Sequence, residues 1–177
     1  NDSLSLCFQT SCVECGLYSV AGGGGAARHL YLEGGNVAAA VRSGGGVETI
    51  VSKGADYADG RWHMAVHTVG DDGQRLYVDG QIVASGLASG AAYAEGAQVK
   101  LGSRHRQLVY NYTKVSIDKD TYDTVLAPSQ VLALYQAWCA FSPDSSGSGV
   151  VTSPWERTVP LGLEGPYRID LTGSDVL

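Results

Sequence analysis

The chain has 177 residues, of which 44% are hydrophobic, so it has enough apolar material for a core and is not a disordered protein. Twelve basic residues against 18 acidic ones give a net charge of −6, and no basic stripe is present, so a nucleic-acid partner is not expected. No run of about 18 apolar residues occurs, and membrane insertion is therefore not expected either.

Period-two alternation dominates the chain, and glycine-rich turns such as Asp79–Gly80 separate the alternating stretches. Many short strands at close spacing are typical of an antiparallel sandwich or barrel. The expected strands lie near Leu4–Phe8, Gly16–Ala21, His29–Glu33, Asn36–Val41, Val47–Ser52, Trp62–Val69, Gln74–Val78, Gln81–Ala84, Gln98–Gly102 and Leu108–Asp118.

The last third of the chain departs from this pattern. Apolar residues recur at helical spacing from Val131 to Trp138, and Pro128 suits a first helical turn, so we expect one short amphipathic helix that caps a sheet. Residues 142–157 are rich in Ser, Gly and Pro, which is typical of a linker. Alternation resumes in the tail, residues 158–177, which is expected to supply one further strand.

The four cysteines are Cys7, Cys12, Cys15 and Cys139. Their C-x4-C-x2-C spacing with a distant fourth matches the outline of an iron–sulfur ligand set, but bulky and charged residues such as Phe8 and Glu14 stand where a cluster loop favours small ones. A four-cysteine zinc site lacks a second C-x2-C pair near Cys139. The even number favours two disulfides in an extracellular domain over free buried thiols or a metal. We expect Cys139 to be tied to the N-terminal cluster, and all three connectivities stay open.

The most specific motifs are DGRWHMAV at Asp59–Val66 and LYVDGQIVA at Leu76–Ala84. The first is a tight turn that leads into a strand and directs Trp62 and Met64 to one side. The second is a hairpin around the Asp79–Gly80 turn, where Asp and Gly tolerate positive backbone angles.

These motifs resemble the laminin-G-like, concanavalin A-like jelly roll, in which a DGxWH strand precedes an LYVDGxxV hairpin. Val99–Gly102 and Val115–Asp118 resemble later strands of that family, and Leu126–Tyr135 resembles its closing helix. The resemblance covers roughly residues 4–138. It implies an all-β fold, an antiparallel two-sheet jelly-roll sandwich over residues 1–141 with one short C-terminal helix.

The resemblance also implies a non-catalytic extracellular module that binds a glycan or a cell-surface or matrix protein, often with calcium, beside neighbouring domains of a larger secreted or surface adhesion protein. Planar donors beside aromatic rings suit sugar hydroxyls or an acidic group. The alternative is that such side chains merely solvate a loop or pack on a sheet. The candidate ligand-binding residues on this ground are Arg104, His105, Arg106, Tyr110 and Tyr112.

Calcium would need carboxylates and backbone carbonyls gathered at one place. Two groups of carboxylates are candidates, Asp71 with Asp72 in a turn and Asp118 with Asp120 and Asp123 after a strand. Neither group has the spacing of a calcium loop, and turn or capping aspartates are the simpler interpretation. His63 and His67 lie four apart, which on a strand separates them by about 13 Å, too far to share a metal. We expect His63 to pack or hydrogen-bond structurally.

An enzyme is the main alternative, because glucanases and polysaccharide lyases use the same sandwich. Retaining glycosidases need two carboxylates about 5–5.5 Å apart. None of the glutamates is closely paired in sequence with another, so we do not expect catalysis; they are Glu14, Glu33, Glu48, Glu95, Glu156 and Glu164. A second alternative is a structural spacer of a surface protein, and Asn111–Thr113 would be a glycosylation sequon in a eukaryotic secretory pathway.

Overall fold

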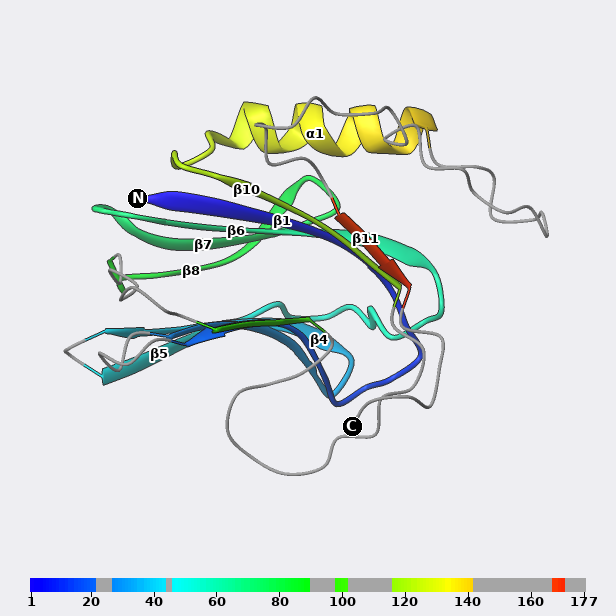
Figure 1. Cartoon of the computed structure of the whole chain (residues 1–177), viewed down its shortest axis with the longest axis horizontal. Helices are drawn as coiled ribbons and strands as arrows, with labels where there is room; N and C mark the ends of the chain where they lie inside the picture. The colour runs from blue at the N-terminus through cyan, green and yellow to red at the C-terminus, as the bar shows by residue number, and fades with distance from the viewer. Residues whose placement is uncertain (22–26, 44–45, 90–97, 102–115, 142–166, 171–177) are drawn as a thin grey trace.

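A computed structural model describes residues 1–21, 27–43, 46–89, 98–101, 116–141 and 167–170. Figure 1 shows two facing β-sheets with one helix outside them. In chain order the elements are β1 (Asp2–Gln9), β2 (Cys15–Ala21), β3 (Ala27–Glu33), β4 (Asn36–Ser43), β5 (Gly46–Val51), β6 (Trp62–Gly70), β7 (Gly73–Val78), β8 (Gln81–Gly86), β9 (Gln98–Leu101), β10 (Ser116–Tyr122), α1 (Pro128–Phe141) and β11 (Tyr167–Asp170).

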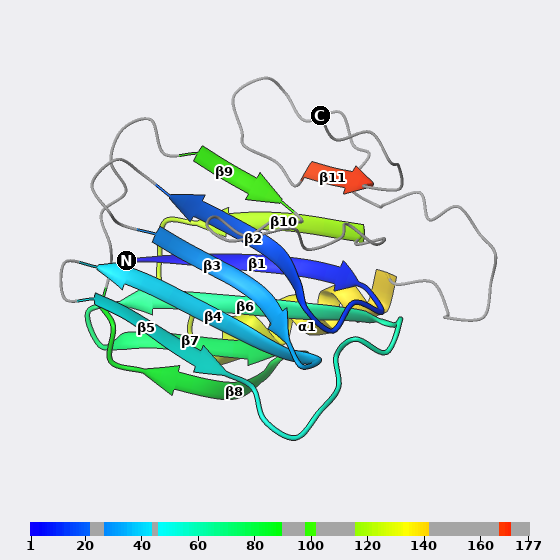
Figure 2. The same cartoon turned by 90° about the horizontal axis from the view of Figure 1, so that it is seen from below.

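The two sheets are antiparallel throughout the described strands. One has six strands in the order β11-β10-β1-β6-β7-β8, and the other has five in the order β5-β4-β3-β2-β9 (Figure 2). Because β1 and β2 belong to different sheets, the chain crosses the sandwich at the turn that follows Gln9. The predicted two-sheet antiparallel sandwich with one short helix is confirmed.

The core lies between the sheets and follows from the alternation. Leu4, Leu6 and Phe8 of β1 point inward, and they pack in one cluster with Leu30 and Leu32 of β3. All five side chains are at most 1% exposed. Removing a leucine or phenylalanine side chain of this size from water contributes about 1.5–3 kcal/mol. The intervening residues of the same strands point outward.

Helix α1 covers the outer face of the six-stranded sheet (Figure 1). Strand β6 is consequently buried on both faces. Met64 and Val66 pack toward the helix residue Val131, with Trp62 at the edge of the same cluster, whereas Ala65 belongs to the core between the sheets. The prediction that Trp62 and Met64 share one side of the strand is confirmed.

Strand β10 ends later in the chain than the sequence predicts. A strand was expected over Leu108–Asp118; residues 108–115 lie outside the described residues, and the strand continues through Tyr122. Asp118 and Asp120 therefore lie within a strand and not after one. The reason is that β10 pairs with β1 along its whole length, from Ser116 opposite Gln9 to Tyr122 opposite Ser3, and this ladder overrides the low strand propensity of aspartate.

The tail contributes strand β11, which pairs with β10 at the edge of the six-stranded sheet. The division into a domain over 1–141, a linker over 142–157 and a tail over 158–177 stays a prediction. Within the described residues, no helix has the length and apolar character needed to cross a membrane.

Candidate functional site

Three segments far apart in sequence meet at one end of the sandwich. They are the β1–β2 turn (residues 10–14), the β3–β4 turn at Gly34–Gly35, and the loop before β6 (residues 52–61). We call this region the Asp59–His63 end. Charged, aromatic and sulfur side chains come together here, among them Asp59, His63, Tyr57 and Cys12.

Backbone hydrogen bonds tie these segments to the β1–β2 turn. The amide of Gly35 donates to the carbonyl oxygen of Val13 at 3.1 Å, and the amide of Gly60 donates to that of Thr10 at 3.0 Å. The amide of Tyr57 in turn donates to the carbonyl oxygen of Gly35 at 2.8 Å. The β1–β2 turn is therefore the hub to which the other two segments are attached.

His63 stands between two carboxylates at this end. Its Nδ1 lies 2.8 Å from Oδ2 of Asp79, and its Nε2 lies 3.1 Å from Oδ1 of Asp59. The ring packs edge-on against Tyr57, with centroids 5.1 Å apart, and beside Phe8. Only 7% of His63 is exposed. The prediction that His63 packs and hydrogen-bonds structurally is confirmed.

Asp79 holds the β7–β8 turn against the start of β6. Its φ of 51° is the left-handed conformation that few residues besides glycine and Asp or Asn adopt readily. The Asp79 carboxylate accepts a hydrogen bond from the amide of Met64 at 3.0 Å, and the Asp79 amide donates to the Met64 carbonyl at 2.8 Å. At the neighbouring Gly80, an added Cβ would lie 3.1 Å from Tyr135 of α1, so the helix packs closely on this turn.

The electrostatics favour an ionic bridge. Burial disfavours the His63 imidazolium, but hydrogen bonds and charge from Asp79 and Asp59 outweigh it and raise the pKa of His63. Burial likewise opposes ionisation of Asp59, yet hydrogen bonds from Arg61 and His63 lower the pKa of that carboxyl to about 2. Both shifts act in the same direction, since each favours the charged forms of His63 and Asp59.

This arrangement positions the surrounding segments and offers little for proton transfer, because both ring nitrogens of His63 are occupied. Arg61 is different: 73% of its side chain is exposed, and its guanidinium is held on Asp59. The half-buried Trp62 follows it. The end therefore presents to solvent one guanidinium that is held by a carboxylate.

The candidate ligand residues Arg104, His105, Arg106, Tyr110 and Tyr112 all lie outside the described residues. The strands that flank their segment are described. β9 ends at Leu101, opposite Tyr18 and running toward the Asp59–His63 end, and β10 begins at Ser116, opposite Gln9 at that end. The last residue of β9 and the first residue of β10 thus lie toward the same end of the sandwich as Arg61.

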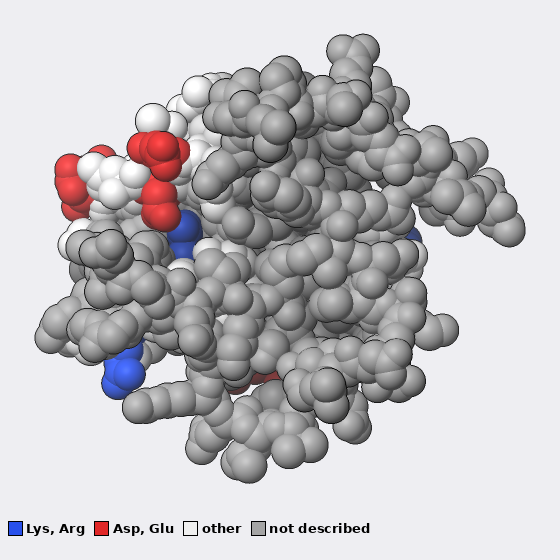
Figure 3. Space-filling view, in the orientation of Figure 1, with Lys and Arg blue, Asp and Glu red and all other residues white. Residues whose placement is uncertain are grey.

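One of the two groups of calcium candidates lies at the other end of the sandwich. Asp71 and Asp72 are exposed in the β6–β7 turn, at the opposite end of the sandwich, where Figure 3 shows acidic side chains gathered. The Asp71 carboxylate accepts a hydrogen bond from the side chain of Asn1 at 3.2 Å. Among the residues that the structure describes, no group of three or more His, Cys, Asp or Glu side chains is placed to hold a metal ion. Calcium binding stays a prediction.

The cysteines are distributed over two sides of the six-stranded sheet. Cys7 is buried on the helix side, and the exposed Cys139 lies on α1 itself. Cys15 packs in the core between the sheets, and Cys12 borders the same core from the β1–β2 turn. No disulfide bond joins the four cysteines, all of which are described, so the two expected disulfides stay a prediction. The four sulfurs do not face one point, which disfavours a shared metal.

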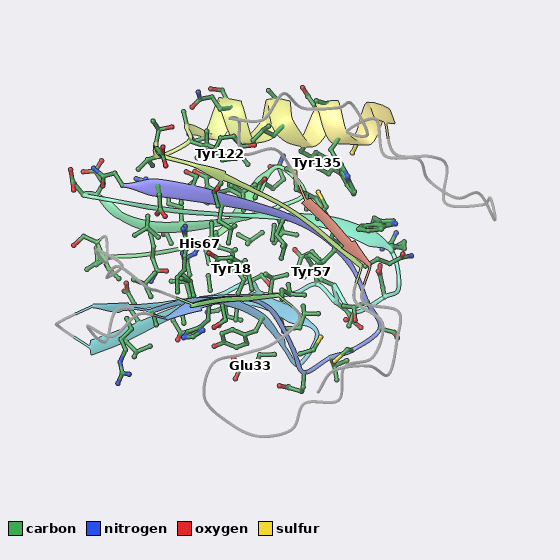
Figure 4. The ribbon with its side chains drawn as sticks, in the orientation of Figure 1. Tyr18, Glu33, Tyr57, His67, Tyr122 and Tyr135 are labelled. Atoms are coloured by element: carbon green, nitrogen blue, oxygen red, sulfur yellow. The ribbon has the colours of Figure 1, made fainter. Side chains whose placement is uncertain are left out.

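A second polar cluster, which the sequence analysis missed, spans the interior at the opposite end. Arg28 of β3, 2% exposed, reaches across to His67 of β6 and to Asp2. His67 Nε2 lies 3.0 Å from Oε1 of Gln74, whose amide donates to the Glu48 carboxylate at 3.0 Å. Figure 4 shows His67 between the sheets, whereas Tyr122 and Tyr135 lie on the helix side.

The alternation of inward and outward residues along the strands contains a signal for this cluster. Arg28, His67 and Gln74 each stand two residues from an inward-facing Leu30, Ala65 or Leu76, so each occupies an inward position of its strand. Buried polar side chains nearly always have a hydrogen-bond partner, so polar residues at inward positions indicate an interior network.

Comparison of the sequence with known protein families shows which family the chain belongs to. The family described as the concanavalin A-like lectin/glucanases superfamily matches residues 10–132. The chain belongs to this superfamily. The motifs at Asp59–Val66 and Leu76–Ala84, from which the resemblance was inferred, lie within the match. No curated protein sequence matches the chain.

Solved structures show the same fold. The receptor-binding domain of botulinum neurotoxin D has a TM-score of 0.59 and 13% identity over 79% of this chain. The binding domain of Paraclostridial Mosquitocidal Protein 1 has a TM-score of 0.59 and 16% identity over 77% of this chain. The ligand-binding domain of botulinum neurotoxin serotype D in complex with N-acetylneuraminic acid has a TM-score of 0.58 and 14% identity over 77%. This member of the superfamily spans 36–38% of the length of those chains.

The superfamily name covers both lectins and glucanases, so the fold alone does not choose between binding and catalysis. Among the described glutamates, Glu14, Glu33 and Glu48 stand on three different segments. The Glu48 carboxylate is engaged by the amides of Leu87 and Gln74. It holds the end of β8 against β5 in this superfamily member.

Proposed function

We propose that the chain is a non-catalytic recognition module that binds a glycan or a protein partner and belongs to a larger secreted or surface protein. Membership of a superfamily named for lectins and glucanases is compatible with this proposal, and the fold shared with receptor-binding and binding domains of toxins supports it. One of those domains is described in complex with N-acetylneuraminic acid.

We place the ligand at the Asp59–His63 end. The observation that carries this is the convergence of two features: β9 runs toward this end and β10 begins at it, these being the strands that flank residues 102–115, and Arg61 presents its exposed guanidinium there. Arg104, Arg106 and Tyr110 in that segment would add further planar donors and an aromatic ring. Guanidinium groups bind carboxylates and vicinal hydroxyls with two parallel hydrogen bonds, and aromatic rings stack on sugar faces.

The rigid part of the site is the network around His63. Because Asp59 is held by His63 and by Arg61, the guanidinium is anchored without a ligand, and less side-chain entropy is lost on binding. The acidic ligands that Arg61 could engage must compete with Asp59. A ligand with both hydroxyl and carboxylate groups, which can bridge the pair, fits this arrangement better than a simple anion.

The test is binding of the purified chain to an array of neutral and acidic glycans, in calcium and in chelator. We expect binding that the Arg104→Ala/Tyr110→Ala variant and the Arg61→Ala variant each reduce at least about tenfold, a loss of about 1.4 kcal/mol. Arg42→Ala is the matched control, because Arg42 is an exposed arginine on β4, opposite Ala27 and Val47 at the far end of the sandwich.

The other outcomes separate the alternatives. Loss of binding in chelator would assign calcium to the site. Capture of a surface or matrix protein without any glycan signal would assign a protein ligand. Release of reducing ends from a polysaccharide would make the chain an enzyme and overturn the proposal, and no binding to either class of ligand would leave the spacer function.

A further inference from the structure

Two thiols stand side by side in the hub of the Asp59–His63 end. The Cys15 thiol donates to the carbonyl oxygen of Cys12 at 3.3 Å, and the two thiols interact with each other. The amide of Cys12 donates to Oγ1 of Thr10 at 3.0 Å, which folds the turn back on itself. The sulfur atom of Cys15 thus lies against the backbone of Cys12, three residues earlier in the same turn.

The other two cysteines face away from this pair. Cys7 points to the helix side of the six-stranded sheet, where it packs in the cluster that contains Val131 and Trp138. Cys15 packs from the other sheet into the core, so the backbone of β1 and its neighbours stands between Cys7 and Cys15. Cys139 follows Trp138 on the helix, on the same side of the sheet as Cys7.

We propose that Cys12 and Cys15 form a disulfide bond in the β1–β2 turn. This pairing selects one of the three connectivities that the sequence leaves open. It leaves Cys7 and Cys139, both on the helix side of the six-stranded sheet, as the second pair.

The bond forms by thiol–disulfide exchange with a low-molecular-weight disulfide as oxidant. The Cys12 thiolate attacks one sulfur of that disulfide and expels one thiolate, which leaves a mixed disulfide on Cys12. The Cys15 thiolate then attacks the Cys12 sulfur and expels the second thiolate. Two electrons pass from the protein to the oxidant, and the two released thiolates take up the two protons that Cys12 and Cys15 lose.

The order of attack follows from exposure. Cys12 is half-buried and therefore reachable by the oxidant, whereas Cys15 is buried, and burial and the neighbouring Cys12 raise the pKa of its thiol. The consequence is structural. The turn accepts hydrogen bonds from Gly35 and Gly60, so a covalent link across it stiffens the hub that carries the other two segments.

The test maps the bond in the wild-type chain. The chain is equilibrated in oxidised and reduced glutathione, blocked with N-ethylmaleimide in acid-quenched denaturant, and cut by a Glu-specific protease and chymotrypsin. Cleavage after Phe8 and Glu14 isolates Cys12 in the segment 9–14 and separates it from Cys15. We expect segment 9–14 to remain joined to the segment that begins with Cys15, with the loss of two hydrogens. A blocked Cys12, or Cys12 joined to Cys7 or Cys139, would overturn the proposal.

Two variants and a second measurement sharpen the result. Cys7→Ser should retain the joined segments, and Cys15→Ser should leave Cys12 blocked. By hydrogen exchange, the amides of Gly35 and Gly60 should be protected more strongly in the oxidised chain than in the reduced one. Equal protection in both states would contradict the stiffening of the hub, whatever the mapping shows.

Discussion

Arg28 of the five-stranded sheet donates from Nε to Nδ1 of His67 in the six-stranded sheet, at 2.9 Å, and so joins the two sheets through the interior. Because arginine is only a donor, His67 Nδ1 must carry the lone pair and Nε2 the proton, which it donates to Gln74. One contact thus sets the tautomer of a buried histidine and the orientation of the next side chain.

Replacement of Arg28 by Met should lower the free energy of unfolding by about 2–4 kcal/mol, because it leaves the acceptor atoms of His67 and Asp2 without their donor. Urea unfolding measures the change. Arg42→Met removes an exposed arginine of the neighbouring strand and should stay within about 0.5 kcal/mol of the wild type. A change at Arg28 as small as that at Arg42 would show that the cluster does not stabilise the fold.

The stability contributed by His67 should fall as the pH decreases below 6.5. Burial and the positive Arg28 lower the pKa of His67 well below 6.5, so below that pH the unfolded chain binds a proton that the folded chain does not. Unfolding free energies measured from pH 7 to about pH 5 should therefore decrease less in His67→Gln than in the wild type. Parallel curves for the two proteins would contradict the assignment.

His63 should behave in the opposite way. Its pKa is raised above 6.5 by Asp79 and Asp59, so its contribution is complete below pH 6.5 and is lost as the pH rises through the higher folded value. Melting temperatures measured upward from pH 6.5 should decline in the wild type and decline less in His63→Gln. The experiment separates the two histidines, because the stability contributed by His67 changes below pH 6.5 and that contributed by His63 changes above it.

Asp79→Ala should cost about 2–3 kcal/mol, because it removes the acceptor for the Met64 amide and the partner of His63 and places alanine at a φ of 51°. Asp79→Asn should cost less, since asparagine tolerates this conformation and keeps an acceptor for Met64. Chemical denaturation ranks the two variants. Equal losses of unfolding free energy in the two variants would assign the whole effect to the negative charge that Asp79 places beside His63.

Two glycines with positive φ should respond differently to alanine. At Gly73, with a φ of 104°, a Cβ would collide with the carbonyl oxygen of Gly86 on β8, and neither backbone can move freely, so Gly73→Ala should cost about 3 kcal/mol or more. At Gly34, with a φ of 57°, no atom lies within 4 Å of the added Cβ, and the cost should be about 1 kcal/mol of backbone strain. Thermal unfolding of both variants checks the difference.

Much of the fold follows from local pattern. Alternation places Leu4, Leu6 and Phe8 on one face of a strand before any partner is known, and Pro128 marks the start of the helix. The C-terminal end of β10 could not be predicted from local pattern. Residues 118–122 have the composition of a turn, and only the pairing with β1, more than a hundred residues away in sequence, makes them a strand.

The candidate site likewise has one part that the sequence predicts and another that depends on the fold. The DGxWH motif predicts a structural role for His63, and its hydrogen bonds and ring packing confirm it. The partnership of His63 with Asp79 and the cluster from Arg28 to Glu48 depend on residues in different strands. Their hydrogen bonds join atoms that sequence spacing does not relate.

The glycine-rich, acidic and alternating sequence was enough by itself to specify an antiparallel sandwich, because the strand period and the turn residues act over a few positions. It was also enough to identify the superfamily through the Asp59–Val66 and Leu76–Ala84 motifs. Only the tertiary structure decided which groups meet: the Cys15 thiol with the Cys12 carbonyl, Arg28 with His67, and the β1–β2 turn with the loop before β6. The physical reason is that a strand's partners are chosen by burial and hydrogen bonding across the sheets, and these are properties of the assembled fold.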